Sequence, residues 1–82
     1  LIQEVPIHIS TLLLGGNVRI NTPKGSRIQI EVPERTKIGD RMRIQGHGHQ
    51  GADLDIEFVL KETEELTEKQ RKALNQLRDS GL

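Results

Sequence analysis

The sequence contains no cysteine, tryptophan or tyrosine, and Phe58 is its single aromatic residue. Without cysteine, neither a disulfide nor a thiolate zinc site can stabilise the chain. One aromatic side chain leaves almost nothing on which nucleotide bases could stack, which argues against a single-strand nucleic-acid binder. Core packing and self-association therefore remain as the routes to a stable fold.

An excess of charge of one sign and long apolar runs are absent as well. Twelve basic and twelve acidic residues give a formal net charge of zero, which argues against a protein whose main task is to neutralise phosphates. The longest apolar run, Leu12 to Leu14, is far too short to cross a bilayer. We therefore expect neither a nucleic-acid partner nor a membrane partner.

The length of 82 residues allows one small domain, and the hydrophobic share of 33% is a lean supply for its core. Domains of this size bury a modest fraction of their surface and are often supported by a partner. No signal peptide is recognisable. The chain begins at Leu1 rather than at methionine, in the middle of an alternating pattern, which favours a piece of a longer protein.

Alternation of apolar and polar residues predicts five short strands. They cover residues 5–9, 17–21, 27–32, 42–44 and 54–60. Pro6 cannot donate to a ladder, so we expect the first strand at a sheet edge or with Pro6 facing outward. The second and third strands are expected to form a hairpin across the turn at 22–26. Residues 11–14 are typical of a single helical turn that Gly15 ends.

From Leu66 onward the apolar spacing becomes helical, and Thr67 with Gln70 forms a capping box. The prediction is an all-β, two-layer sandwich of about five short strands with a C-terminal amphipathic helix. Residues 1–65 would form the sandwich and residues 66–82 a dimerisation helix. The expected core comprises Val5, Ile7, Ile9, Leu13, Val18, Ile20, Ile28, Ile30, Val32, Ile44, Leu54, Ile56 and Phe58.

The chain offers little catalytic chemistry. His47 and His49 could chelate a metal or belong to a polar loop, but a structural zinc site needs four ligands and no cysteine completes one. The spacing of Gly46, Gly48 and Gly51 imitates a dinucleotide fingerprint without the βαβ unit that gives it meaning. We therefore expect no enzyme, no metal and no cofactor.

Apolar surface remains as the functional feature. Val5, Val18 and Ile20 either fill the core or form a shallow channel beside an unpaired strand edge. In the second case an extended peptide could add to that edge, its main chain supplying affinity and its alternate side chains specificity. Residues of the C-terminal helix offer a second surface, since a helix of about three turns is marginal alone. That stripe consists of Leu66, Ala73, Leu74 and Leu77.

A set of short motifs, in order and spacing, resembles the second C-terminal domain of DnaJ-type heat-shock co-chaperones over about residues 2–78. The motifs are Val5-Pro6-Ile7, Leu13-Leu14-Gly15-Gly16, Thr22-Pro23-Lys24-Gly25, Val32-Pro33 with Gly39, Ile44-Gln45-Gly46-His47-Gly48, Asp53-Leu54, and Leu66-Thr67 with Gln70, Ala73-Leu74 and Leu77. The resemblance implies a chaperone domain that binds unfolded polypeptide, forms a homodimer and works with a DnaK-type ATPase chaperone.

The resemblance also assigns roles to residues. It implies a peptide groove at Val5, Val18 and Ile20, and dimerisation through the terminal helix. The His-Pro-Asp motif of a J domain is not found in these residues, so this chain is not expected to stimulate the ATPase itself. A cytoplasmic parent is expected, although a mitochondrial matrix parent would have the same sequence features.

Two other functions stay open. A small β-barrel that binds RNA or a ribosomal surface would use a basic patch, and a purely structural module would have only itself as partner. The patch would consist of Lys24, Arg27, Arg35, Lys37, Arg41 and Arg43. Binding to RNA should weaken steeply with added salt, whereas capture of an apolar peptide should not.

Overall fold

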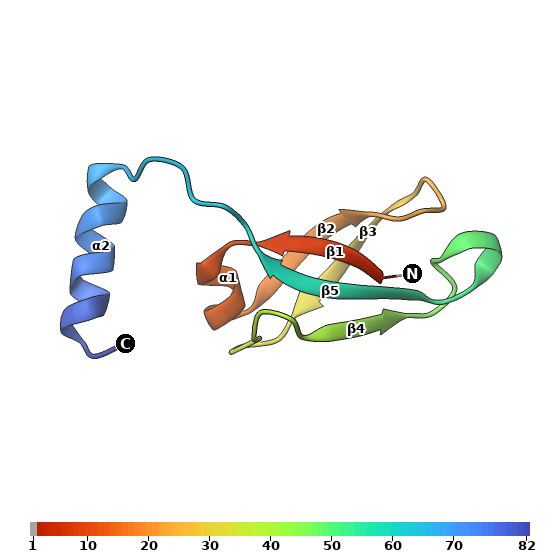
Figure 1. Cartoon of the computed structure of the whole chain (residues 1–82), viewed down its shortest axis with the longest axis horizontal. Helices are drawn as coiled ribbons and strands as arrows, with labels where there is room; N and C mark the ends of the chain where they lie inside the picture. The colour runs from red at the N-terminus through yellow and green to blue at the C-terminus, as the bar shows by residue number, and fades with distance from the viewer. Residues whose placement is uncertain (1) are drawn as a thin grey trace.

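The structure, a computed structural model, describes residues 2–82, which contain five strands in two small sheets, two α-helices and a short 3-10 helix, His49–Gly51. Residue 1, where the predicted domain begins, lies outside these residues. The strands are β1 (Ile2–Ile7), β2 (Gly16–Asn21), β3 (Arg27–Val32), β4 (Arg41–Ile44) and β5 (Leu54–Leu60). The helices are α1 (Ile9–Leu14) and α2 (Glu68–Asp79), as Figure 1 shows. The predicted mostly-β fold with a C-terminal helix is confirmed.

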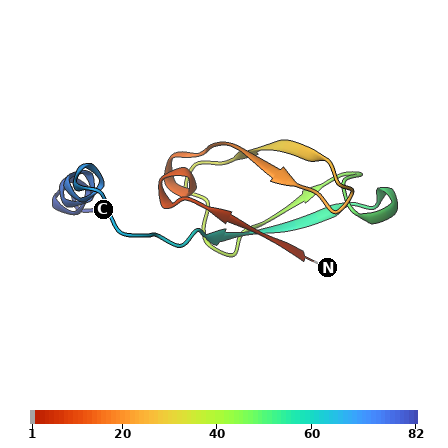
Figure 2. The ribbon, with the colours of Figure 1, turned by 90° about the horizontal axis from the view of Figure 1, so that it is seen from above.

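The two sheets form two layers that enclose the core (Figure 2). One sheet has the order β1-β5-β4, and the other is the β2–β3 hairpin. The predicted hairpin is confirmed, since β2 and β3 pair antiparallel with Val18 opposite Ile30. The position of β1 was predicted in part: it is an edge strand and Pro6 is exposed. Its parallel pairing with β5, with Val5 beside Phe58, was not expected.

The core lies between the layers and is built from alternate residues of the strands. Its most deeply buried side chains are Phe58, Leu12, Ile56 and Val32. Val18, Ile28, Met42 and Ile44 are partly buried against this core. Most of the predicted core residues are therefore placed correctly, because period-two alternation presents one face of each strand to the opposite layer.

Two core predictions are wrong, and both fall in α1. Ile9 is 48% exposed and Leu13 is 36% exposed, whereas Leu12 is only 2% exposed. The reason is a change of period, because the chain becomes helical at Ile9 and the alternation of β1 no longer applies. In a helix this short, one residue of the leucine run faces the core, and its neighbours face away from it.

The α1 helix ends where predicted, at Gly15. Gly15 has a φ of 76°, and a Cβ at this position would lie 2.9 Å from the carbonyl oxygen of Val32. Both facts favour glycine, which adopts positive φ readily and has no side chain to clash. The carbonyls at the end of α1 accept from the segment after β3: the Thr36 N–H donates to the Leu12 carbonyl oxygen at 2.8 Å and the Arg35 N–H to that of Leu13 at 3.0 Å.

Helix α2 stands at one end of the molecule, joined to β5 by an extended segment (Figures 1 and 2). Its predicted capping box is confirmed, since the Gln70 N–H donates to Thr67 Oγ1 and the Thr67 N–H donates to Gln70 Oε1. No residue of α2 is buried. The radius of gyration is 15.1 Å, against about 12 Å for a compact chain of this length.

Candidate functional site

The unpaired edges of β1 and β2 face one another across the gap between the two sheets. A shallow hollow of about 220 Å³ lies between them. From β1 it is lined by Gln3, Glu4, Val5 and Pro6, and from β2 by Arg19, Ile20 and Asn21. The Gln3 amide bridges the two edges, because its Nε2 donates to the carbonyl oxygen of Asn21 at 2.8 Å.

The floor of this hollow is apolar and belongs to the core. Val5 is 5% exposed and Ile20 is 6% exposed, so most of their surface already contacts the protein itself. Val18 is partly buried against the core and does not line the hollow. The structure thus brings two of the three predicted peptide-binding residues together, while the binding role of all three stays a prediction.

The edge of β2 presents main-chain groups to the hollow. The Thr22 N–H donates to the Ser26 carbonyl, so the groups of Thr22 point into the β2–β3 hairpin. Because successive residues of an antiparallel strand point alternately to its two sides, those of Asn17, Arg19 and Asn21 point outward. Asn21 confirms this phase, since its carbonyl accepts from Gln3 on the outer side. The outward groups of Asn17 and Arg19 have no hydrogen-bond partner within residues 2–82.

Gln3, Arg19 and Asn21 were not predicted as site residues. One signal in the sequence could have pointed to Gln3: it stands two residues before Val5 and four before Ile7, in the phase that buries both. A polar residue at such a position needs a polar partner. Nothing in the local sequence of Arg19 or Asn21 could reveal that their strand edge faces β1.

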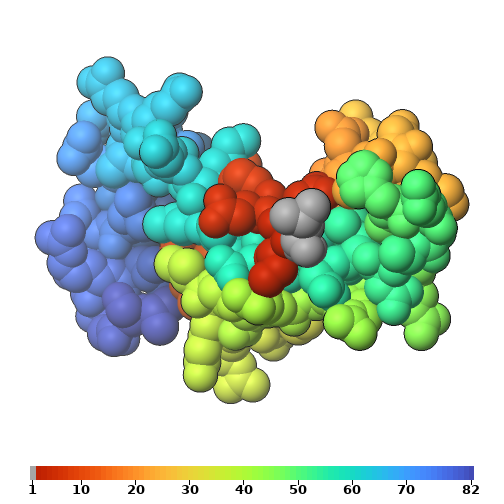
Figure 3. All heavy atoms as spheres, turned by 45° about the vertical axis from the view of Figure 1, so that its right-hand side comes forward, coloured from red at the N-terminus to blue at the C-terminus, as the bar shows by residue number. Residues whose placement is uncertain are grey.

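A second apolar surface lies where α2 approaches α1. A hollow of about 270 Å³ is lined by residues of α1 and α2 and by the residues that flank them, which include Ile9, Leu66, Ala73 and Leu74. Leu74 is 42% exposed and Leu77 is 39% exposed, so the helix stripe is incompletely covered. Figure 3 shows α2 and the segment before it as one end of the molecule, opposite the end formed by the β2–β3 turn and the loop after β4.

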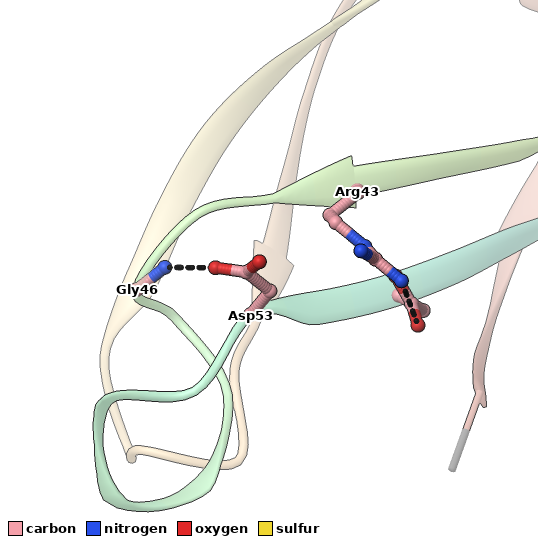
Figure 4. Close-up of polar contacts among 4 residues, drawn as sticks. Arg43, Gly46 and Asp53 are labelled. Carbon is pink, nitrogen blue, oxygen red and sulfur yellow. Dashed lines mark hydrogen bonds and ion pairs between the residues drawn. The ribbon is translucent and has the colours of Figure 1, made fainter.

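The loop between β4 and β5 carries the two neighbouring histidines. It is closed by the Gly48 N–H, which donates to the Ala52 carbonyl at 2.7 Å, and by the Gly46 N–H, which donates to Asp53 Oδ1 at 3.2 Å (Figure 4). Gly48 is required here, because a Cβ would lie 2.5 Å from the Asp53 carbonyl oxygen. Within residues 2–82, no group of three or more histidine and carboxylate side chains could hold a metal ion.

The basic residues do not gather in one patch. Arg41 pairs with Glu57 at 3.1 Å, and Arg43 pairs with Asp55 at 2.8 Å, both across β4 and β5. The hydrogen bond from Arg43, drawn in Figure 4, lowers the pKa of the Asp55 carboxyl below its usual value. Lys24 and Arg35 lie beyond opposite ends of β3, about 20 Å apart for a strand of this length. This arrangement does not favour an RNA-binding face.

Known proteins resemble this chain over most of its length. Residues 1–60 match the family described as the DnaJ C terminal domain. This chain belongs to the DnaJ C-terminal domain family. Three relatives are chaperone proteins DnaJ: that of Rhodospirillum centenum is 35% identical, that of Fusobacterium nucleatum subsp. nucleatum 34%, and that of Paramagnetospirillum magneticum 30%. The alignments cover 94–95% of this chain but only 21–22% of each relative.

This chain spans about a fifth of the length of these chaperones. The family is not enzymatic, in agreement with the prediction from the sequence. Within residues 2–82, no helix combines the length and the apolar character that a membrane crossing needs.

Proposed function

We propose that this DnaJ C-terminal domain binds extended segments of unfolded polypeptide at the outer edge of β2. One observation carries the proposal: the outward main-chain groups of Arg19 and Asn21 face a hollow whose floor contains Val5 and Ile20, and Asn17 continues the same strand edge. An added strand would bond to these groups, and its alternate side chains would lie over the apolar floor. This arrangement suits client segments in which apolar and other residues alternate. Their exact sequence matters little, because the main chain supplies the affinity.

The edge of β2 is a better docking site than that of β1. Pro6 has no N–H, so β1 offers an incomplete set of donors to an added strand. The outer edge of β3 is also unpaired within its sheet, but the lining residues of the hollow come from β1 and β2 only. The proposal therefore distinguishes between two edges of the same hairpin.

A titration with an isotope-labelled chain tests the binding site. The probe is a short peptide of alternating leucine and threonine, added to the chain while amide resonances are followed by NMR. We expect the amides of Asn17, Arg19 and Asn21 to shift and to gain protection from exchange, and those of β3 to change less. Saturable binding that leaves these three amides unchanged would place the peptide elsewhere.

The proposal includes self-association through residues 66–82, the role that the resemblance to the second of the two C-terminal domains implies. Each copy exposes apolar residues on α2, among them Leu74 and Leu77, and on α1, among them Ile9 and Leu14. A second copy is the partner that the surfaces suit, because a two-fold axis would let α2 of each subunit cover apolar residues of the other. Sharing this burial would offset the lean core of a single chain.

In a longer parent protein, a dimer would join two polypeptide-binding edges that could hold the same client. Two linked sites retain an extended chain better than one, since the second contact is intramolecular. We further propose that the parent delivers such clients to a DnaK-type ATPase chaperone in the cytoplasm. The mitochondrial matrix is the alternative compartment, as the sequence features are the same for both.

A further inference from the structure

Gln3 occupies an inward-facing position of β1 that the alternation reserves for an apolar residue. Val5 and Ile7, which share its face of the strand, are 5% and 2% exposed. Gln3 itself is half-buried, and its amide crosses from the first sheet to the carbonyl of Asn21 in the second. A residue that departs from the local pattern in this way is often part of a functional site.

The carbonyl that Gln3 contacts is one that an added strand would need. The outward groups of β2 recur at every second residue, and Asn21 lies at the end of this row, next to the turn. Gln3 Nε2 lies 2.8 Å from the Asn21 oxygen, the usual distance for a main-chain N–H in a β-ladder. The side-chain amide is chemically the same donor that a peptide main chain would bring.

We propose that Gln3 is a latch on the polypeptide-binding edge: its side-chain amide holds the Asn21 carbonyl until the main chain of a client displaces it. This inference rests on the proposed function and names the chemistry of the exchange. The ligand must supply a free main-chain N–H at the position facing Asn21, so a client segment with proline there cannot release the latch.

The exchange is close to balanced, which suits a reversible chaperone. Gln3 loses one hydrogen bond and its amide returns to water, while the client N–H gains the same acceptor. The net contribution of such a bond corresponds to a factor of about two to ten in an equilibrium constant. Removing the latch should therefore tighten peptide binding by about two- to tenfold.

The test compares Gln3→Met with Gln45→Met in the full 82-residue chain. Methionine keeps the length and the apolar contacts of glutamine but has no N–H to donate. Gln45 follows β4 in the same sheet as β1, is exposed, and has no side-chain hydrogen bond within residues 2–82. The probe is the peptide of alternating leucine and threonine, labelled with fluorescein and followed by anisotropy.

We expect Gln3→Met to bind the peptide about two- to tenfold more tightly than the unmodified chain, and Gln45→Met to bind it equally well. Equal or weaker binding by Gln3→Met overturns the latch but leaves the proposed function intact. Absence of binding in every variant overturns both. If only Gln3→Met binds the peptide, and the unmodified chain and Gln45→Met do not, the latch is supported, because Gln3 then keeps the edge closed to the probe.

The side-chain amide of Gln3 gives a second readout that does not depend on a variant. In the unmodified chain, the Nε2 proton that donates to the Asn21 carbonyl should be protected, and it should lose that protection as the peptide saturates the β2 edge. The same peptide with proline in place of each central threonine should bind more weakly and leave the Gln3 amide protected. Binding at the β2 edge with the Gln3 amide still protected would overturn the latch.

Discussion

Arg19 and Gln29 lie directly opposite one another in the β2–β3 hairpin, yet their main-chain groups point to opposite edges of the sheet. Their pair is of the kind that exchanges no hydrogen bonds, because it alternates with pairs such as Thr22 and Ser26, where the Thr22 N–H donates to the Ser26 carbonyl. One hairpin thus carries two comparable edges, and only the β2 edge faces the hollow beside β1.

This relationship provides a matched pair of variants. Arg19→Pro removes an N–H from the β2 edge, and Gln29→Pro removes the corresponding N–H from the β3 edge. Proline is tolerated where a strand N–H faces outward, so both chains should fold. We expect Arg19→Pro to weaken binding of the leucine–threonine peptide about fivefold or more, and Gln29→Pro to leave it unchanged, as measured by anisotropy. Equal losses in the two variants would contradict binding at the β2 edge.

Self-association is tested on α2. Leu74→Asp places a charge within the exposed apolar stripe, where burial against a second copy would strip it of water. We expect this variant to sediment as a monomer while its circular dichroism keeps the signal of the sheets. Asn75→Asp introduces the same residue on another face of the helix and should sediment like the unmodified chain.

The dimer prediction also depends on the unmodified chain. At a concentration of about tens of micromolar, where a weak dimer would be populated, sedimentation should show the two-subunit species. A monomer under those conditions would contradict self-association through α2.

The leucine run of α1 allows a stability test within one short helix. Leu12→Ala empties part of the core and should lower the free energy of unfolding by about 2–5 kcal/mol. Leu14→Ala makes the same chemical change at a residue that is 75% exposed, and should change stability by less than about 0.5 kcal/mol. Urea unfolding in a Leu74→Asp background measures both without a contribution from self-association. Similar losses of unfolding free energy at the two positions would contradict the burial of Leu12 and the exposure of Leu14.

The ion pair between Arg43 and Asp55 predicts a dependence on pH. Arg43 donates to Asp55, which lowers the pKa of that carboxyl in the folded chain below its usual value of 3.8. A carboxyl with a lowered folded-state pKa contributes stability that is present above its unfolded pKa and is lost as the pH falls through the folded-state value. Stability should therefore decline below about pH 4.

Asp55→Asn should flatten that decline, because the amide does not titrate. The contribution is small, since both side chains are exposed to solvent and the pair is screened. Asp79→Asn, at the end of α2, serves as the control and should keep the pH dependence of the unmodified chain. Urea midpoints at pH 7 and pH 3 make the comparison, and an unchanged slope in Asp55→Asn would remove the pair from the explanation.

Local chemistry explains what could be predicted from the sequence. Period-two alternation identifies the faces of β3 and β5, because alternate residues face the core and the residues between them face away from it. The Thr67–Gln70 cap and the end of α1 at Gly15 depend on residues a few positions apart, so their geometry follows from the sequence nearby. The DnaJ family was likewise recognisable from the order and spacing of short motifs.

The sequence alone therefore determined that the chain forms five short strands and a C-terminal helix, that α1 ends at Gly15, and which family the chain belongs to. Only the tertiary structure decided that β1 pairs in parallel with β5, that Leu12 rather than Leu13 enters the core, and that Gln3 reaches Asn21. These relationships join residues far apart in the chain or depend on the rotation of a short helix. No local pattern carries that information, because it arises only when the two layers close over a shared core.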